Sequence, residues 1–131
     1  MLNVFQNIKT LKLERSRFVE NSGLKINLPH LQSLTVDNMR LLKNFSKLQQ
    51  LKHFHHTGKV KIYEFDEIFD PSQILELSID GEPNSKFLNL FSNLRSLKLY
   101  HFGDNISFDE FLPQMKFLTS LIFTYWRNRS N

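Results

Sequence analysis

The sequence predicts an α/β fold: a solenoid of about six coils, with a parallel sheet on the concave face and short helices or irregular turns on the convex face. The first observation is a six-residue pattern, apolar-x-x-apolar-x-apolar, which recurs six times in 131 residues. A repeat of about twenty residues is typical of stacked solenoids. Within each copy the fourth and sixth positions are mostly apolar and the fifth is mostly polar, as on a strand with one buried face. The stretches between copies are too short for the full helices of a doubly wound sheet.

The copies place the expected strands in order along the chain. Their first positions lie 23, 17, 26, 20 and 24 residues apart, at Ile8, Leu31, Leu48, Ile74, Leu94 and Leu118. The 17-residue interval leaves room only for an extended or single-turn return. The expected core consists of the apolar pattern positions Leu11, Leu13, Leu34, Val36, Leu51, Leu77, Ile79, Leu97, Leu99 and Leu121.

Short helices are expected in three of the return segments. Ser107-x-x-Glu110 is a capping box, followed by apolar residues at helical spacing. Residues 65–71 resemble residues 108–113, and in both a proline is expected to end the helix before the next strand. Residues 85–91 form the third such segment.

Composition narrows the classes of function. Seventeen Lys and Arg against thirteen Asp and Glu give a formal charge of +4, but the signs alternate along the chain. Nucleic-acid binding normally needs a clustered basic stripe, so it is the disfavoured class. The absence of cysteine excludes disulfides and thiolate metal sites. No signal peptide or long apolar run is found, which predicts a cytoplasmic or nuclear protein without a membrane anchor.

Catalytic and metal-binding patterns are weak. The histidine run His53-Phe54-His55-His56 has the residue type of a zinc site, but His53 is assigned to a core column and no further ligand group follows. The acidic residues between Glu64 and Asp70 fit the first turn of a helix better than a pair of catalytic carboxylates. We therefore expect no catalytic residue, metal, cofactor or small-molecule substrate.

The six registered copies resemble the leucine-rich repeat family, over about residues 5 to 126. The family pattern has Asn or Cys in a further column, which here holds Ser16, Met39, His56, Glu82, Phe102 and Trp126. This departure predicts irregular coils of the degenerate, intracellular type. We expect residues 1–131 to be a single repeat domain and a fragment without terminal caps.

The resemblance implies a non-enzymatic scaffold that binds a protein partner on its concave face. One setting in such families is substrate recognition for a ubiquitin ligase, in which an F-box precedes the repeats; no F-box is found in this sequence. The alternatives are a free-standing scaffold, a fragment of a receptor ectodomain, or a nucleic-acid-binding module. The sequence does not indicate an oligomeric state.

The expected partner-binding residues follow the core positions of the strands, or lie between them. Lysines in one column predict a locally basic centre that suits an acidic partner, and aromatic and histidine side chains at one edge predict contact points. The eight residues are Lys12, Lys52, Phe54, His55, Lys98, Tyr100, His101 and Tyr125.

Overall fold

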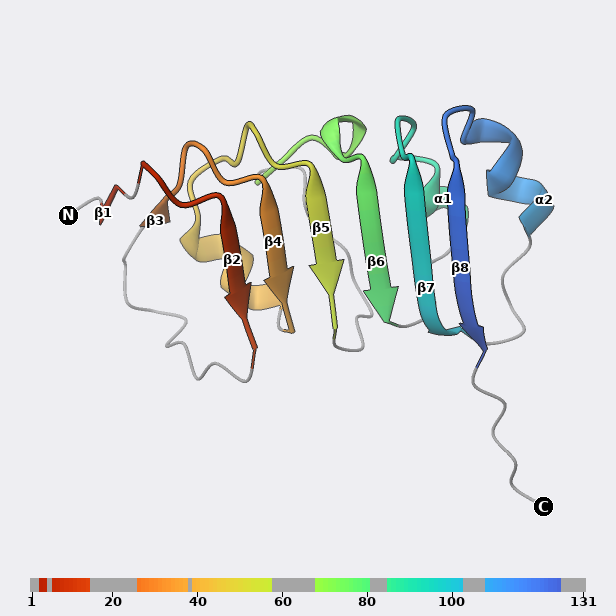
Figure 1. Ribbon diagram of the computed structural model, residues 1–131, viewed down its shortest axis with the longest axis horizontal. Helices are drawn as coiled ribbons and strands as arrows, with labels where there is room; N and C mark the ends of the chain where they lie inside the picture. The colour runs from red at the N-terminus through yellow and green to blue at the C-terminus, as the bar shows by residue number, and fades with distance from the viewer. Residues whose placement is uncertain are drawn as a thin grey trace, which may run out of the picture.

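The computed structural model describes residues 3–4, 6–14, 26–37, 39–57, 68–80, 85–102 and 108–125. Its main feature is one parallel sheet of six strands, in which each strand pairs with the next one along the chain (Figure 1). The α/β class and the parallel pairing predicted from the sequence are therefore confirmed. The strands are β2 (Thr10–Leu13), β4 (Ser33–Val36), β5 (His53–His56), β6 (Glu76–Asp80), β7 (Ser96–Phe102) and β8 (Ser120–Tyr125).

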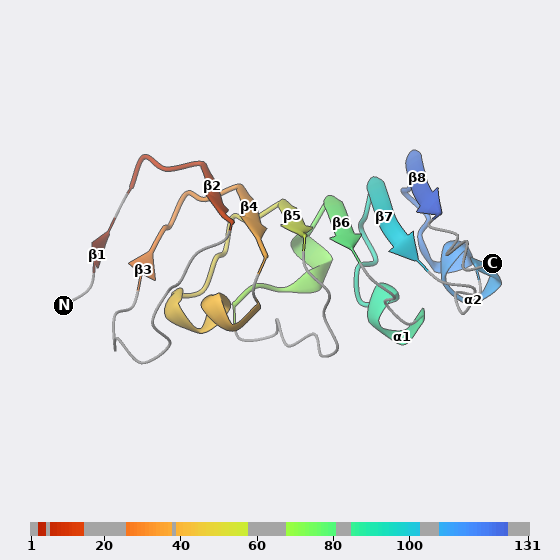
Figure 2. The ribbon, with the colours of Figure 1, turned by 90° about the horizontal axis from the view of Figure 1, so that it is seen from below.

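A second, smaller ladder lies beside the first strands of the sheet. β1 (Asn3–Val4) pairs in parallel with β3 (Ile26–Asn27), and Ile26 forms a further parallel bridge with Phe45. The described helices lie together on one side of the main sheet (Figure 2). They are all short, and none offers an apolar run that could cross a membrane. They are η1 (Met39–Asn44), η2 (Pro71–Gln73), α1 (Ser85–Leu88), α2 (Phe108–Phe111) and η3 (Leu112–Gln114).

The helices confirm two of the three expected segments and correct the role of the prolines. α1 and α2 fall where short helices are expected, while Ser107 and residues 65–67 lie outside the described residues. Pro71 begins η2 instead of ending a helix, because Asp70 caps the segment and accepts a hydrogen bond from Ser72 N at 2.9 Å. Proline suits the first helical turn, where its missing N–H costs nothing. Pro113 likewise lies inside η3.

The third copy of the pattern is shifted by three residues from its predicted place. Phe54 pairs with Leu34 on one side and Leu77 on the other, so this copy reads Leu51-x-x-Phe54-x-His56. The intervals between first positions become 23, 20, 23, 20 and 24 residues, and the predicted 17-residue interval was wrong.

The same tight turn recurs before the strands and agrees with the corrected register. In each turn a backbone N–H donates to the carbonyl oxygen three residues earlier, over 3.2–3.4 Å. The donors are the first positions of five copies: Leu31, Leu51, Ile74, Leu94 and Leu118.

The core lies between the sheet and the helical segments. Inward strand residues pack with helix residues such as Leu42, Phe87 and Leu88 in one cluster. Aromatic rings fill part of it, with Phe54 and Phe69 centroids 5.2 Å apart. Of the ten predicted core residues, the seven in β4, β6, β7 and the turn before β5 are buried. The other three, Leu11, Leu13 and Leu121, are partly buried because β2 and β8 are the outermost strands.

Candidate functional site

The candidate site is the sheet face opposite the helices, here called the open face. Because side chains alternate along a strand, the first, third and fifth positions of each strand point to this face while the second and fourth point to the core. In the described part of the chain, every helix lies on the other side (Figure 2). Parallel pairing therefore aligns the outward side chains into rows that run across all six strands.

The third-position row combines long and small polar side chains. Thr35 and Ser78 are 8% and 6% exposed, although they are on the open face. Their larger neighbours in the row shield them from solvent. The row reads Lys12, Thr35, His55, Ser78, Lys98 and Ile122.

An ion-paired group occupies the middle of the open face. His53 and Glu76 are direct partners in adjacent strands, and His53 Nδ1 donates to Glu76 Oε2 at 2.8 Å. Lys98 Nζ approaches the other oxygen, Glu76 Oε1, at 3.6 Å. Glu76 thus joins three strands, β5, β6 and β7, through contacts between side chains.

The surroundings of this group lower two pKa values. Burial lowers the pKa of His55, and the charges of Lys98, His53 and Lys12 act in the same direction, while Glu76 opposes them. Burial alone would raise the pKa of Glu76, but the hydrogen bond from His53 and the nearby positive charges lower it overall. His55 is therefore neutral and Glu76 ionised at neutral pH.

The structure corrects the placement of two of the predicted partner-binding residues. Phe54 is 0% exposed and faces the core, so it cannot contact a partner on the surface. Lys52 is exposed but precedes β5, so it does not share a row with Lys12 and Lys98. Both corrections follow from the three-residue shift, which also moves His53 from the core to the open face and His56 into the core.

The remaining predicted residues lie in strands, but the shift also moves His55 from beyond the strand end into the third-position row with Lys12 and Lys98. Lys12, His55, Lys98 and Tyr100 are on the open face and are partly or fully exposed. His101 lies at the irregularity between Tyr100 and Phe102 in β7, where the register with β8 shifts. Tyr125 ends β8.

The charge of the open face differs from the sequence prediction. Among its described residues, two lysines, Lys12 and Lys98, stand against four carboxylates. Three of the carboxylates, Glu14, Asp37 and Asp80, follow or end strands, and the fourth is Glu76. The middle of the face is basic only in its third-position row, and its strand-end side is acidic. The first residues of strands, such as His53 and Glu76, are not among the partner-binding residues predicted from the sequence. Their contact depends on the register of the sheet, which shows which residues of neighbouring strands lie side by side.

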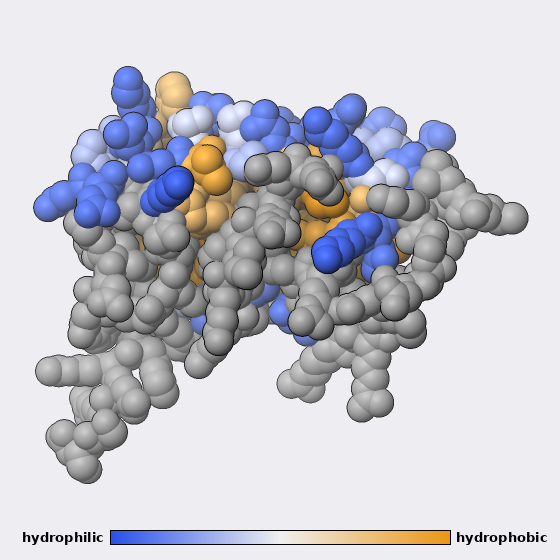
Figure 3. Space-filling view, turned by 180° about the vertical axis from the view of Figure 1, so that it is seen from behind, coloured by the Kyte–Doolittle hydropathy of each residue, from blue (hydrophilic) through white to orange (hydrophobic). Residues whose placement is uncertain are grey.

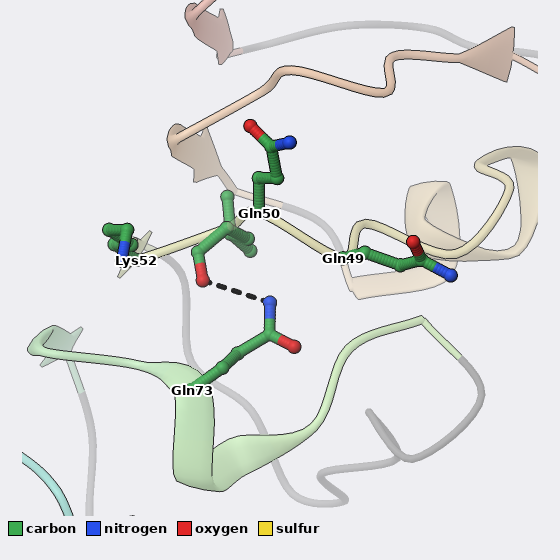
Figure 4. A pocket seen from close by; sticks show the side chains of 5 residues that line it. Gln49, Gln50, Lys52 and Gln73 are labelled. Atoms are coloured by element: carbon green, nitrogen blue, oxygen red, sulfur yellow. Dashed lines mark hydrogen bonds between the residues drawn. The ribbon is translucent and has the colours of Figure 1, made fainter.

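A shallow hollow lies at the edge where the strands begin. It has a volume of about 260 Å³ and is lined by Gln49, Gln50, Leu51, Lys52 and Gln73. Gln73 extends from η2 towards the turn before β5, and its Nε2 donates to the carbonyl oxygen of Leu51 at 2.9 Å (Figure 4). The same Nε2 also donates to the carbonyl oxygen of Leu48 at 2.7 Å. These bonds join two consecutive turns and fix the hollow's wall.

Among the described residues, no group of three or more His, Asp or Glu side chains is arranged to hold a metal ion. Comparison with protein-family models, curated proteins and solved structures finds no match. The function is therefore inferred from the surfaces themselves.

Proposed function

We propose that the chain is a leucine-rich-repeat solenoid of about six coils, and that it binds a protein partner through the open face, which is the concave face in such folds. The corrected spacing of 20 to 24 residues between successive copies supports this fold, because leucine-rich repeats are 20–29 residues long. The turn that recurs before five of the six strands is consistent with one structural unit repeated along the chain.

The observation that carries the function is the division of the strands into two faces. The inward positions are filled by buried or partly buried side chains that are apolar apart from His56, while outward rows from six strands carry varied polar and aromatic groups. Substitutions on such a surface leave the core unchanged, so the surface can be fitted to a partner. Tyr100, partly exposed between Asp80 and Thr124, supplies an aromatic contact of the kind enriched at binding sites.

The contacts between Glu76, His53 and Lys98 are explained by a structural role in a scaffold, so they need no catalytic role. These contacts cross three strands, which holds the face in one arrangement before a partner arrives. Substrate recognition for a ubiquitin ligase remains a prediction of the sequence resemblance.

The test is partner capture from cell extract by the wild-type chain and by a double open-face variant, Lys12→Glu with Tyr100→Ala. The control is Lys86→Glu, which changes an exposed lysine in α1 on the other side of the sheet. We expect a protein that the wild type and the control retain and that the open-face variant loses. Equal capture by all three chains would contradict the proposal. Capture of nucleic acid alone, weakening steeply with salt, would favour the rival class.

A further inference from the structure

The edge at which the strands begin, here called the amino edge, concentrates positive charge. It comprises the described residues 6–9, 28–32, 46–52, 69–75, 91–95 and 115–119, which contain five lysine or arginine residues and one carboxylate. Its formal charge of +4 equals that of the whole chain. Figure 3 shows hydrophilic side chains gathered along this edge. The charged residues are Lys9, Lys47, Lys52, Asp70, Arg95 and Lys116.

Three of these cations form a row with fixed backbone. Each of the three immediately precedes a strand, and each is exposed to solvent: Lys9, Lys52 and Arg95. The backbone carbonyl oxygen of each accepts hydrogen bonds from two successive backbone N–H groups at the start of the next strand of the main sheet. At Lys9, for example, the donors are Gln32 N at 2.8 Å and Ser33 N at 3.0 Å. The same paired bonds continue through Gln32 and Leu75, so one ladder joins the whole row.

The row has a regular spacing because the cations fall on every second strand. Lys9 precedes β2, Lys52 precedes β5 and Arg95 precedes β7, and one strand lies between each pair. Neighbouring strands are about 4.8 Å apart, so the backbone positions of successive cations are about 10 Å apart.

The spacing of about 10 Å between cations favours an acidic ligand that is α-helical over one that is extended. In an α-helix, residues seven apart lie on one face and are separated by about 10.5 Å along the axis, which matches the row. In an extended strand, residues on one face are about 6.7 Å apart, and those about 10 Å apart point to opposite faces. Between Lys52 and Arg95 the row holds the partly exposed Leu75, which offers an apolar contact to the same helix.

We propose that the amino edge is a second interaction surface, which takes an acidic α-helical segment of a protein partner across the strand starts. Asp70 does not oppose this, because its carboxylate already caps η2, where two hydrogen bonds from Ser72 lower its pKa. The proposal does not depend on binding at the open face, since the residues involved are different.

The experiment uses a synthetic helical peptide with three glutamates at seven-residue intervals in a neutral background. Its control peptide has the same composition with the glutamates spread around the helix. Binding of both to the full chain is measured by fluorescence anisotropy at about 0.05 and 0.15 M salt. We expect the heptad peptide to bind more tightly than the control peptide and to weaken with salt.

The variant Lys52→Gln with Arg95→Gln should reduce affinity for the heptad peptide about fivefold or more. The matched control is Lys43→Gln with Lys86→Gln, which removes the same charge from exposed lysines outside the edge and should change affinity less than about twofold. Circular dichroism checks that both variants remain folded. Absence of peptide binding, equal binding of the two peptides, equal losses in the two variants, or tighter binding of a single-stranded oligonucleotide would each overturn the proposal.

Discussion

Replacement of Phe54 by alanine tests the register of the sheet directly. The Phe54 side chain is 0% exposed, lies between Leu34 and Leu77 in the adjacent strands, and packs against Phe69 at 5.2 Å. Truncation of a buried phenylalanine costs about 3–5 kcal/mol, part of which is the lost ring contact. If His53 occupied the core instead, as the sequence pattern first predicts, Phe54→Ala would have little effect.

The assay is urea unfolding followed by circular dichroism. His53→Ala serves as the comparison, because the ring is on the open face and its loss removes one part-exposed hydrogen bond, worth about 1 kcal/mol or less. Phe54→Leu provides a milder variant, with an expected loss of about 1–2 kcal/mol, in case the alanine variant does not fold. A larger loss of free energy of unfolding in His53→Ala than in either Phe54 variant would refute the register.

Three further predictions concern the core, the turns and the response to pH. Leu97→Ala should lower the free energy of unfolding by about 2–5 kcal/mol in the same assay, since Leu97 is 0% exposed in β7, between β6 and β8. Gln73→Ala should cost about 1–3 kcal/mol, because the carbonyl oxygens of Leu48 and Leu51 each lose a side-chain donor and Leu48 keeps the longer turn bond from Leu51 N at 3.4 Å. Gln73→Glu, which cannot donate, should not restore stability. The lowered pKa of His55 means that the unfolded chain takes up a proton first as the pH falls below the ordinary value of 6.5, so stability declines there. His55→Gln should reduce that acid-side decline in pH-dependent unfolding curves, and an unchanged decline would contradict the assignment.

The sequence predicted most of the sheet because five of the six copies are unambiguous. In the copy at Leu94, for example, apolar Leu97 and Leu99 alternate with polar Ser96 and Lys98, and only one register buries the leucines. The copy before β5 is ambiguous because apolar residues recur at every third position and fit either register. All of them are buried, in the turns as well as in the strand: Leu42, Phe45, Leu48, Leu51 and Phe54.

The candidate site was harder to predict than the core for the same reason. A shift of three residues exchanges the two faces of a strand, so it moved Phe54 off the predicted surface and brought His53 onto it. The His53–Glu76 pair joins residues 23 apart in sequence, which meet only through the pairing of β5 with β6. Such a contact has no local signal in the sequence.

Charge along the strand direction connects the two proposed surfaces. Cations gather where the strands begin, whereas Glu14, Asp37 and Asp80 lie where strands end. A partner that covers both regions would therefore be oriented, with its acidic part over the strand starts and its basic part over the strand ends. Lys52 belongs to the first region only because the structure moves it out of the Lys12 row. Its charge should therefore affect binding of an acidic helix at the edge more than binding of a partner confined to the open face.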